Sequence, residues 1–307
     1  MEKTTQISSL ITDIEQQILT VYNDPILCRQ YAWWTVEAIT NKRKTELINQ
    51  DTIILSEEQQ KNLNEWLEDL ITKQMPIQYL LGSVPFCDVT ILVAPPTLIP
   101  RPETEEWCFN LITKLKKLRN QQITILDLCC GSGCIAITLA QALPHATIYA
   151  CDIADSAIAL SKKNSAHNKT SNLIILHSDL FNALPKDIRF DLIVTNPPYI
   201  TPIEWQTLDQ SVAQWEDKGA LVADDDGLAL IKKIIAVAPQ YLQQNEELQA
   251  QAIPQLMIEI GYLQGPTVAT LMQQADYTDI KIDTDLEHKD RVVSGRTDNV
   301  APTKAAQ

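Results

Sequence analysis

Short apolar stretches alternate with amphipathic segments through residues 123–295, and this pattern predicts an α/β fold with a mostly parallel sheet and helices on both faces. Runs of aliphatic and β-branched residues predict strands at Ile123–Leu128, Ala146–Cys151, Leu173–Leu176, Asp191–Thr195, Leu256–Ile260, Ile280–Asp283 and Arg291–Gly295. Apolar residues at helical spacing predict helices at Ile135–Leu143, Ser156–His167, Leu228–Leu242 and Gly265–Ala275.

The pattern before residue 76 is helical. Apolar residues recur at helical spacing over residues 7–21, and a second helix is predicted at Tyr31–Ile39. Ser56 and Gln59 have the spacing of a capping box, which opens a third helix. Residues 1–75 are therefore expected to form a helical bundle. Because no cluster of catalytic side chains occurs in them, we interpret this bundle as a substrate-docking or lid module.

A hairpin is expected to link this bundle to the larger domain. Tyr79–Gly82 and Val89–Val93 read as strands on either side of the turn-prone stretch Ser83–Asp88. The predicted boundaries are 1–75 for the bundle, 76–97 for the hairpin, 98–298 for the α/β domain and 299–307 for a flexible tail.

Composition narrows the class of protein. The chain has 307 residues and a net charge of −14, which disfavours unaided binding to a nucleic-acid backbone. Seven cysteines, an odd number without framework spacing, favour free thiols in a reducing compartment. The N-terminus lacks a signal-peptide pattern and no apolar run has membrane-spanning length, so we expect a cytoplasmic protein without membrane contact.

A candidate cofactor loop follows the first predicted strand of the α/β domain. Gly131, Gly133 and Ala136 fit the fingerprint of an adenosine-type cofactor, with Asp152 at the end of the next strand as acceptor for ribose hydroxyls. This motif alone leaves NAD and S-adenosylmethionine open. The nearby cysteines lack the paired spacing of a metal site, so no metal is expected.

Further along, Asp179 lies where a carboxylate could accept from the adenine amino group, and Leu180 and Phe181 could either contact the base or belong to the core. These residues follow the third predicted strand of the domain, so their position favours adenosine binding at the same edge of the sheet.

The segment DLIVTNPPYI at Asp191–Ile200 carries the candidate chemistry. An apolar strand stops at Asn196-Pro197-Pro198-Tyr199, because consecutive prolines cannot continue a β-ladder. The Asn196 side chain and the Pro197 carbonyl can accept both hydrogens of a planar –NH2 group while Tyr199 covers its face. Methyl transfer to nitrogen can use such a turn, whereas hydride transfer cannot, so S-adenosylmethionine is the favoured cofactor.

With these motifs the chain resembles the peptide chain release factor glutamine methyltransferases. The resemblance covers nearly the whole chain. It is carried by PIQYLLG at Pro76–Gly82, LIPRPETE at Leu98–Glu105, the loop at Asp127–Gly133, DLIVTNPPYI, DGLALIKKI at Asp226–Ile234, IEIGYLQG at Ile258–Gly265 and DRVVSGR at Asp290–Arg296.

The resemblance implies a class I S-adenosylmethionine-dependent methyltransferase domain with a seven-stranded sheet. It places the cofactor on Cys129, Cys130, Gly131, Ser132, Gly133, Asp152, Leu180 and Asn196, to which the interpretation of the segment after the third strand adds Asp179. It places the substrate on Asn196, Pro197, Pro198, Tyr199, Arg101 and Glu103, with Asn196, Pro197 and Tyr199 as the catalytic residues. Two departures stand out: Cys129-Cys130 replaces the family's usual Gly-Thr, and Leu180 replaces a frequent aromatic residue.

The implied reaction is methylation of the glutamine amide in the Gly-Gly-Gln motif of class 1 release factors, by a monomer with no direct contact to nucleic acid. Two other substrates stay open at this point. One is a glutamine of a ribosomal protein. The other is the N6 amine of adenine in DNA, which the acidic composition and the lack of a target-recognition domain disfavour.

Overall fold

The computed structural model describes residues 3–118, 122–298 and 300. The chain folds into two compact units, one of Met1–Ser83 with Asp209–Trp215 and one of Val84–Leu208 with Glu216–Gln307. The predicted tail at 299–307 lies outside the described residues except for Val300. Within the described ranges, no helix has both the length and the apolar composition needed to span a membrane.

The first unit is helical with one small strand pair. Its elements are β1 Lys3–Gln6, α1 Ile7–Ile18, α2 Pro25–Thr40, α3 Lys44–Leu47, β2 Thr52–Leu55, α4 Glu57–Ile71, α5 Ile77–Leu81 and α10 Gln210–Ala213. The capping box is confirmed, since Ser56 accepts from the Gln59 amide and the Gln59 side chain accepts from the Ser56 amide. The antiparallel pairing of β1 with β2 was not predicted from the sequence.

The linking hairpin exists, but its predicted first strand is wrong. The paired strands are β3 Ser83–Phe86 and β4 Val89–Leu92, whereas residues 79–81 belong to helix α5. Leu80 and Leu81 pack against the apolar core of the first unit, and Gly82 ends the helix at φ 76°, a left-handed conformation that glycine adopts without strain. The apolar run at residues 79–81 is compatible with a strand or a helix. Packing against the core and the Gly82 C-cap favour the helix.

The second unit contains a seven-stranded sheet with the order β10-β11-β9-β8-β5-β6-β7. Its strands are β5 Thr124–Leu128, β6 Thr147–Asp152, β7 Leu173–His177, β8 Leu192–Thr195, β9 Leu256–Glu259, β10 Tyr277–Thr284 and β11 Asp290–Thr297. The five strands from β9 to β7 are parallel, and β10 and β11 pair antiparallel at one side. The predicted fold class is confirmed.

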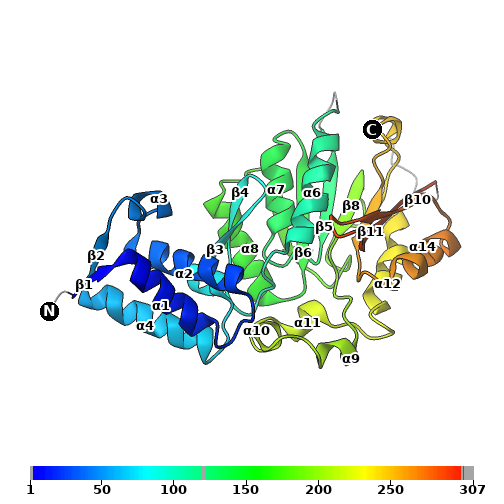
Figure 1. Ribbon diagram of the computed structural model, residues 1–307. Helices are drawn as coiled ribbons and strands as arrows, with labels where there is room; N and C mark the ends of the chain where they lie inside the picture. Colours follow the sequence, from blue (N-terminus) through cyan, green and yellow to red (C-terminus); the bar gives the residue numbers. More distant parts are fainter. Residues whose placement is uncertain (1–2, 119–121, 299, 301–307) are drawn as a thin grey trace. The chain divides into compact units, whose positions relative to one another are not determined.

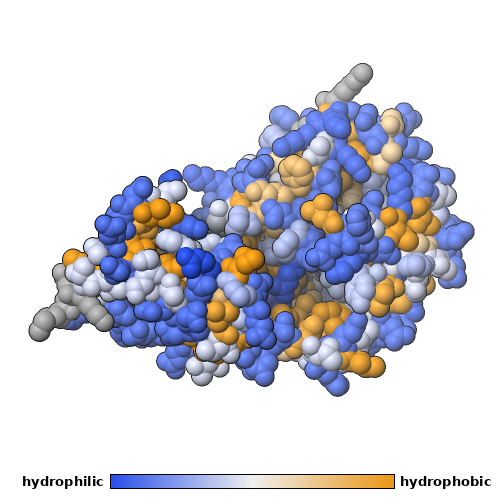
Figure 2. Space-filling model, viewed as in Figure 1, coloured by the Kyte–Doolittle hydropathy of each residue, from blue (hydrophilic) through white to orange (hydrophobic). Residues whose placement is uncertain are grey.

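Helices cover both faces of this sheet, with α6, α7 and α8 on one face and α12 and α14 on the other (Figure 1). The helical segments of this unit are α6 Pro102–Leu115, α7 Cys134–Ala142, α8 Asp155–His167, α9 Pro202–Trp205, α11 Lys218–Leu221, α12 Ala229–Val237, η1 Ala238–Gln240, α13 Glu246–Ala250 and α14 Gly265–Gln274. Hydrophilic residues dominate the visible surface of the unit, with hydrophobic residues in separate patches (Figure 2).

Candidate active site

The strand register brings the predicted cofactor loop and the Asn-Pro-Pro-Tyr turn to the same edge of the sheet. Leu128, the last residue of β5, pairs with Cys151 in β6 and with Thr195 in β8. The Thr195 hydroxyl also donates to the Leu128 carbonyl at 2.9 Å. Cys129 and Asn196 therefore begin loops that leave the carboxyl ends of β5 and β8, and Asp152 is the last residue of β6, between them and β7. Ligands of open α/β sheets bind at such an edge, where the strand order changes direction.

The cofactor loop is held mainly by its neighbour β6. The Cys130 amide donates to the Cys151 carbonyl at 3.0 Å, and the Gly131 amide donates to the Asp152 carboxylate at 2.9 Å. Gly131 has a positive φ of 54°, and no atom lies within 4 Å of the Cβ position that it leaves open. Gly133 is the N-cap of α7, has a φ of 81° and lies close to Ser161. Ser132 is buried. The loop thus keeps an open backbone surface at Gly131, suited to a closely bound ligand.

Asp152 and the segment after β7 lie at the carboxyl ends of two neighbouring strands. The other oxygen of the Asp152 carboxylate accepts from the Ala154 amide at 2.9 Å, and the residue remains partly exposed. Asp179 is exposed, and Leu180 is half-buried with a positive φ of 47°. Phe181 is instead a core residue, stacked on Tyr241. The cofactor roles of Asp152, Asp179 and Leu180 stay predictions. Of the two possibilities for Phe181, contact with the base or packing in the core, the structure shows core packing.

Asp127, which precedes the loop by two residues, is fully buried and accepts a hydrogen bond from the Ala136 amide at 3.1 Å through one oxygen. Among the residues that the structure describes, its other oxygen has no hydrogen-bond partner. Desolvation by burial raises the pKa of this carboxyl well above its usual range. The unused Asp127 oxygen and the Asp152 carboxylate are acceptors that fit the N–H and O–H donors of S-adenosylmethionine, and the open backbone at Gly131 leaves space for a closely bound ligand.

The cysteines around the loop are free thiols, buried at Cys130, Cys134 and Cys151 and partly exposed at Cys129. Burial is the largest cause that raises the pKa of Cys129, Cys130, Cys134 and Cys151, so these side chains are neutral at physiological pH. In residues 3–118 and 122–298 no group of His, Cys, Asp and Glu side chains has an arrangement that could hold a metal ion. Cys129 adopts a φ of 58°, the left-handed region in which the family's usual glycine carries no penalty.

The Asn196 turn is supported by side chains from distant segments. Asn196 Nδ2 donates to Thr104 Oγ1 at 3.3 Å, and the structure describes no residue that donates to Asn196 Oδ1. Pro197 and Pro198 are buried and Tyr199 is half-buried. Gln264 Nε2 donates to the Tyr199 carbonyl at 3.1 Å, and a Cβ on Gly227 would lie only 2.0 Å from that carbonyl oxygen. The turn therefore depends on close packing against residues 227 and 264.

Arg101 and Glu103 lie at the start of α6, beside this turn. Arg101 forms a 2.6 Å ion pair with Glu216, whose side chain is fully buried and whose pKa is raised by desolvation. Glu103 lies 3.7 Å from Arg291. Burial, with a further contribution from Glu259, raises the pKa of the Tyr199 hydroxyl, which keeps it protonated. The structure thus brings Arg101 and Glu103 to the predicted substrate turn, while their substrate-binding roles stay predictions.

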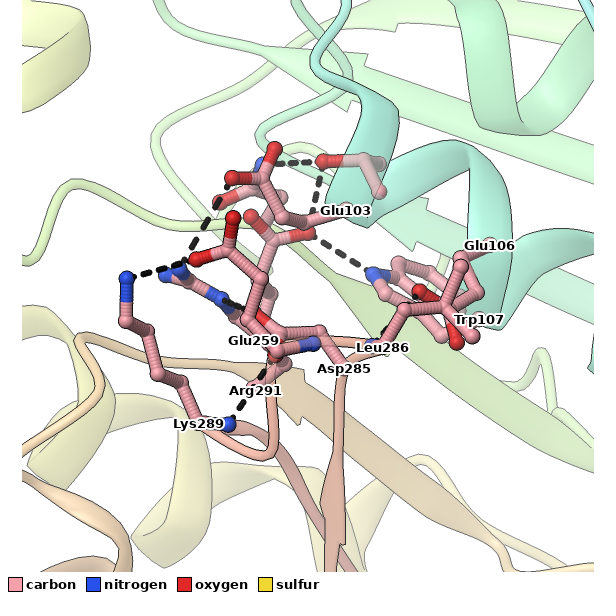
Figure 3. A network of polar contacts seen from close by, with 11 residues as sticks. Glu103, Glu106, Trp107, Glu259, Asp285, Leu286, Lys289 and Arg291 are labelled. Carbon is pink, nitrogen blue, oxygen red and sulfur yellow. Dashed lines mark hydrogen bonds and ion pairs between the residues drawn. The ribbon is translucent and has the colours of Figure 1, made fainter.

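Sequence reasoning expected the Pro100–Glu105 stretch at the site but gave Thr104 no role of its own, and it missed Glu259. Glu259 ends β9, and its Oε2 accepts hydrogen bonds of 2.7 Å from Thr104 Oγ1 and Trp107 Nε1 (Figure 3). Desolvation by burial raises the pKa of Glu259 from its ordinary value of 4.5 to about 6, against the opposing effect of its two hydrogen-bond donors and of Arg291. An acidic residue in the apolar run Leu256–Ile260 was the available signal, because carboxyl groups are rarely buried without a partner.

Comparisons with known proteins point to one family. A family model described as methyltransferase small domain matches residues 110–224, and one described as PrmC N-terminal domain matches residues 29–82. A release factor glutamine methyltransferase of Flavobacterium psychrophilum is 30% identical over 288 residues, which are 92% of this chain and 96% of that protein. That of Coxiella burnetii is 35% identical over 287 residues, again 92% of this chain and 96% of the relative. That of Geobacter sulfurreducens is 35% identical over 73% of this chain and 74% of its own.

Proposed function

The chain belongs to the release factor glutamine methyltransferase family, and on this basis we propose that it methylates the side-chain amide nitrogen of the glutamine in the Gly-Gly-Gln motif of class 1 release factors. As a member of this family it is an S-adenosylmethionine-dependent methyltransferase. The observation that carries the proposal is the Asn196 turn, which leaves the Asn196 Oδ1 acceptor beside the predicted cofactor loop.

The turn offers two acceptors to a primary amide. Asn196 Oδ1 and the Pro197 carbonyl oxygen receive no hydrogen bond from any residue within the described ranges. Because Pro198 has no N–H, its backbone cannot compete for these acceptors. A glutamine side chain carries two N–H donors on one nitrogen, so one N–H can bind each acceptor and the nitrogen is held in a fixed position.

The chemical difficulty is that the amide lone pair is delocalised into the carbonyl group. Two hydrogen bonds from the amide N–H groups to Asn196 and Pro197 orient the nitrogen and favour the build-up of positive charge on it. Tyr199, whose hydroxyl stays protonated, covers one face of the amide and limits access of water. When bound, S-adenosylmethionine supplies a sulfonium methyl group as the electrophile. Asp152 and the Cys129–Gly133 loop, together with Asp179 and Leu180, are proposed to hold it.

Incubation of the protein with radiolabelled S-adenosylmethionine and a class 1 release factor tests the function. We expect one methyl group per release factor, located by peptide mass spectrometry on the glutamine of Gly-Gly-Gln. A release factor with Gln→Ala in this motif should take up no label. Label on a ribosomal protein or on DNA, with none on the release factor, would identify a different substrate and overturn the proposal.

Asn196→Ala tests the proposed role of the turn. One lost orienting hydrogen bond in a water-poor site should slow methylation by roughly a hundredfold, with cofactor affinity and melting temperature close to those of the wild type. Asn110→Ala, on an exposed face of α6, serves as the matched control. Asn196→Asp keeps the size and an acceptor but adds a negative charge, and we expect low turnover with near-normal cofactor affinity. Wild-type methylation rates in both Asn196 variants would contradict this role and show that Asn196 only helps to form the turn.

The first unit, whose residues 29–82 match the PrmC N-terminal domain, is proposed to dock the release factor. Removal of residues 1–75 should leave cofactor affinity unchanged while methylation of the whole release factor falls. A short peptide containing Gly-Gly-Gln should be methylated equally by the full and shortened chains, since it makes no docking contacts. Undiminished methylation of the release factor by the shortened chain would contradict docking.

A further inference from the structure

A buried carboxyl group connects α6, β9 and the catalytic turn. Glu259 is 2% exposed, as is Thr104, and both lie in the second unit. Glu259 Oε2 accepts from Thr104 Oγ1 and from Trp107 Nε1, each at 2.7 Å, and Thr104 Oγ1 is also in contact with Asn196 Nδ2 at 3.3 Å. Figure 3 shows Glu259 and Trp107 directed toward each other from different elements. The three side chains Glu259, Thr104 and Asn196 thus form one continuous hydrogen-bonded chain.

The donor in each of these hydrogen bonds is fixed by chemistry. An indole N–H can only donate, so Glu259 Oε2 accepts from Trp107, and above its pKa of about 6 the Glu259 carboxylate has no proton to donate to Thr104. The single proton of the Thr104 hydroxyl is then directed to the same oxygen. Toward Asn196, Thr104 can therefore only accept.

This order of donors determines the orientation of the Asn196 amide. An asparagine side chain has an oxygen on one side and an NH2 group on the other, and the hydrogen-bond network decides which way each points. Because Thr104 can only accept, Asn196 must direct Nδ2 toward it. Oδ1 then points to the opposite side, away from Thr104. The reversed amide would present N–H groups to a substrate –NH2 group, which has no acceptor to offer them.

We propose that Glu259 and Thr104 are positioning residues for methyl transfer, because they fix the Asn196 amide in the orientation that presents its oxygen to the substrate. This inference rests on the proposed function of Asn196 as the acceptor for the glutamine amide. Neither residue needs to touch the substrate or to move a proton. Their contribution is to remove the second orientation of Asn196 before the substrate binds.

Substitutions of Thr104 separate this role from a structural one. Thr104→Val keeps the shape of the side chain and removes the hydroxyl, so Asn196 can adopt both orientations. We expect kcat to fall roughly tenfold, less than in Asn196→Ala because the acceptor is still present in one of the two orientations, with KM and cofactor Kd within about twofold of wild type. Thr104→Ser restores the hydroxyl and should restore kcat. Thr113→Val, the same substitution at an exposed position of α6, is the matched control.

Glu259→Gln distinguishes positioning from proton transfer. Its amide oxygen still accepts from Trp107 and Thr104, because the indole N–H again requires an acceptor, so the orientation of Asn196 is kept and kcat should stay within about threefold of wild type. A proton acceptor at this position would instead lose its function in Glu259→Gln. A loss of kcat by a hundredfold or more in that variant would overturn the positioning role.

Double substitution tests whether Thr104 acts through Asn196. In an Asn196→Ala background, Thr104→Val should cause no further loss of kcat, because the amide that it orients is absent. Equal losses of kcat from Thr104→Val in both backgrounds would contradict the inference. If Thr104→Val lowers the melting temperature too far for kinetics, Thr104→Ala replaces it in the same cycle.

A spectroscopic measurement makes the inference independent of the substrate. The side-chain NH2 resonances of Asn196, assigned by their loss in Asn196→Ala, should move in Thr104→Val and return to their original positions in Thr104→Ser. If the wild type fails to methylate release factors, the proposed function falls but these resonances still report on the orientation of Asn196. If methylation proceeds while Thr104→Val changes neither kcat nor the resonances, the positioning role falls and the function stands.

Discussion

The Asn196–Tyr199 turn and the Cys129–Gly133 loop leave neighbouring strands, yet different parts of the chain hold them in place. The loop is fixed mainly by backbone and carboxylate groups of the adjacent strand β6, with one further hydrogen bond of 3.0 Å from Asn164 Nδ2 in α8 to the Ser132 carbonyl. The turn is fixed by side chains of Thr104 and Gln264, and by the absence of a side chain at Gly227. A loop held locally can be specified by a short motif, whereas a turn held by distant residues depends on the packing of the whole unit.

This difference predicts that turnover is sensitive to remote substitutions around the turn. In Gly227→Ala the new Cβ would lie 2.0 Å from the Tyr199 carbonyl oxygen, so the turn must move. A displacement of about 1 Å at a reacting centre can reduce turnover by roughly a hundredfold. Gly82→Ala is a matched control, because Gly82 has a similar φ of 76° but no atom within 4 Å of the new Cβ. Steady-state kinetics should show the loss of kcat only in Gly227→Ala. Equal kcat in both variants would show that the turn tolerates displacement.

The same comparison predicts that local substitutions at the loop weaken cofactor binding instead. Asp152→Ala removes the carboxylate that supports the Gly131 amide and that is proposed to accept from the ribose. Cofactor affinity should fall by about 1–3 kcal/mol, the range for lost charge-assisted hydrogen bonds. Calorimetric titration measures this loss. Asp155→Ala removes the same charge from an exposed position three residues later and should bind the cofactor normally. Unchanged affinity in Asp152→Ala would exclude this residue from the cofactor site.

The buried carboxyl behind the turn makes stability depend on pH. The folded-state pKa of Glu259 is about 6, above its ordinary value of 4.5. A carboxyl group with a raised pKa contributes stability below pH 4.5, and this contribution is lost as the pH rises through 6. The 1.5-unit difference corresponds to about 2 kcal/mol. Glu259→Gln cannot ionise, so its free energy of unfolding relative to the wild type should increase by most of this amount between pH 4.5 and 7.5.

Urea unfolding of both proteins at the two pH values measures the change. Other titrating groups contribute equally to the wild type and the variant, so the difference between the two proteins isolates Glu259. A difference that is constant between pH 4.5 and 7.5 would mean that Glu259 titrates alike in the folded and unfolded chains.

The smallest expected effect concerns the strained position in the cofactor loop. Cys129 adopts φ 58°, which costs a residue with a side chain roughly 1–2 kcal/mol. Cys129→Gly should therefore raise the free energy of unfolding by about 1 kcal/mol, after allowance for lost packing and for the greater flexibility of glycine in the unfolded chain. Thermal unfolding would detect this gain as a rise in melting temperature. Destabilisation would show that side-chain packing at Cys129 outweighs backbone strain.

The sequence by itself determined most of the sheet and both candidate loops. Buried parallel strands are nearly continuous apolar runs, so β5, β6, β8 and β9 could be predicted within one or two residues. Asn196-Pro197-Pro198-Tyr199 was recognisable as a turn because adjacent prolines end a strand through local covalent constraints. These features depend on neighbours in the chain, which the sequence displays directly.

Tertiary structure alone decided how the turn is held and which side chains support it. Thr104 and Glu259 are 155 residues apart, and their hydrogen bond exists only because α6 packs beside the end of β9. The helix at Ile77–Leu81 and the pairing of β1 with β2 were likewise set by packing and by contacts between distant segments. Local propensity does not encode such contacts, since the apolar residues involved are compatible with either helix or strand. The proposed orientation of the Asn196 amide likewise depends on tertiary structure. It follows from the hydrogen bonds that link Asn196 through Thr104 to the buried carboxyl group of Glu259, far along the chain.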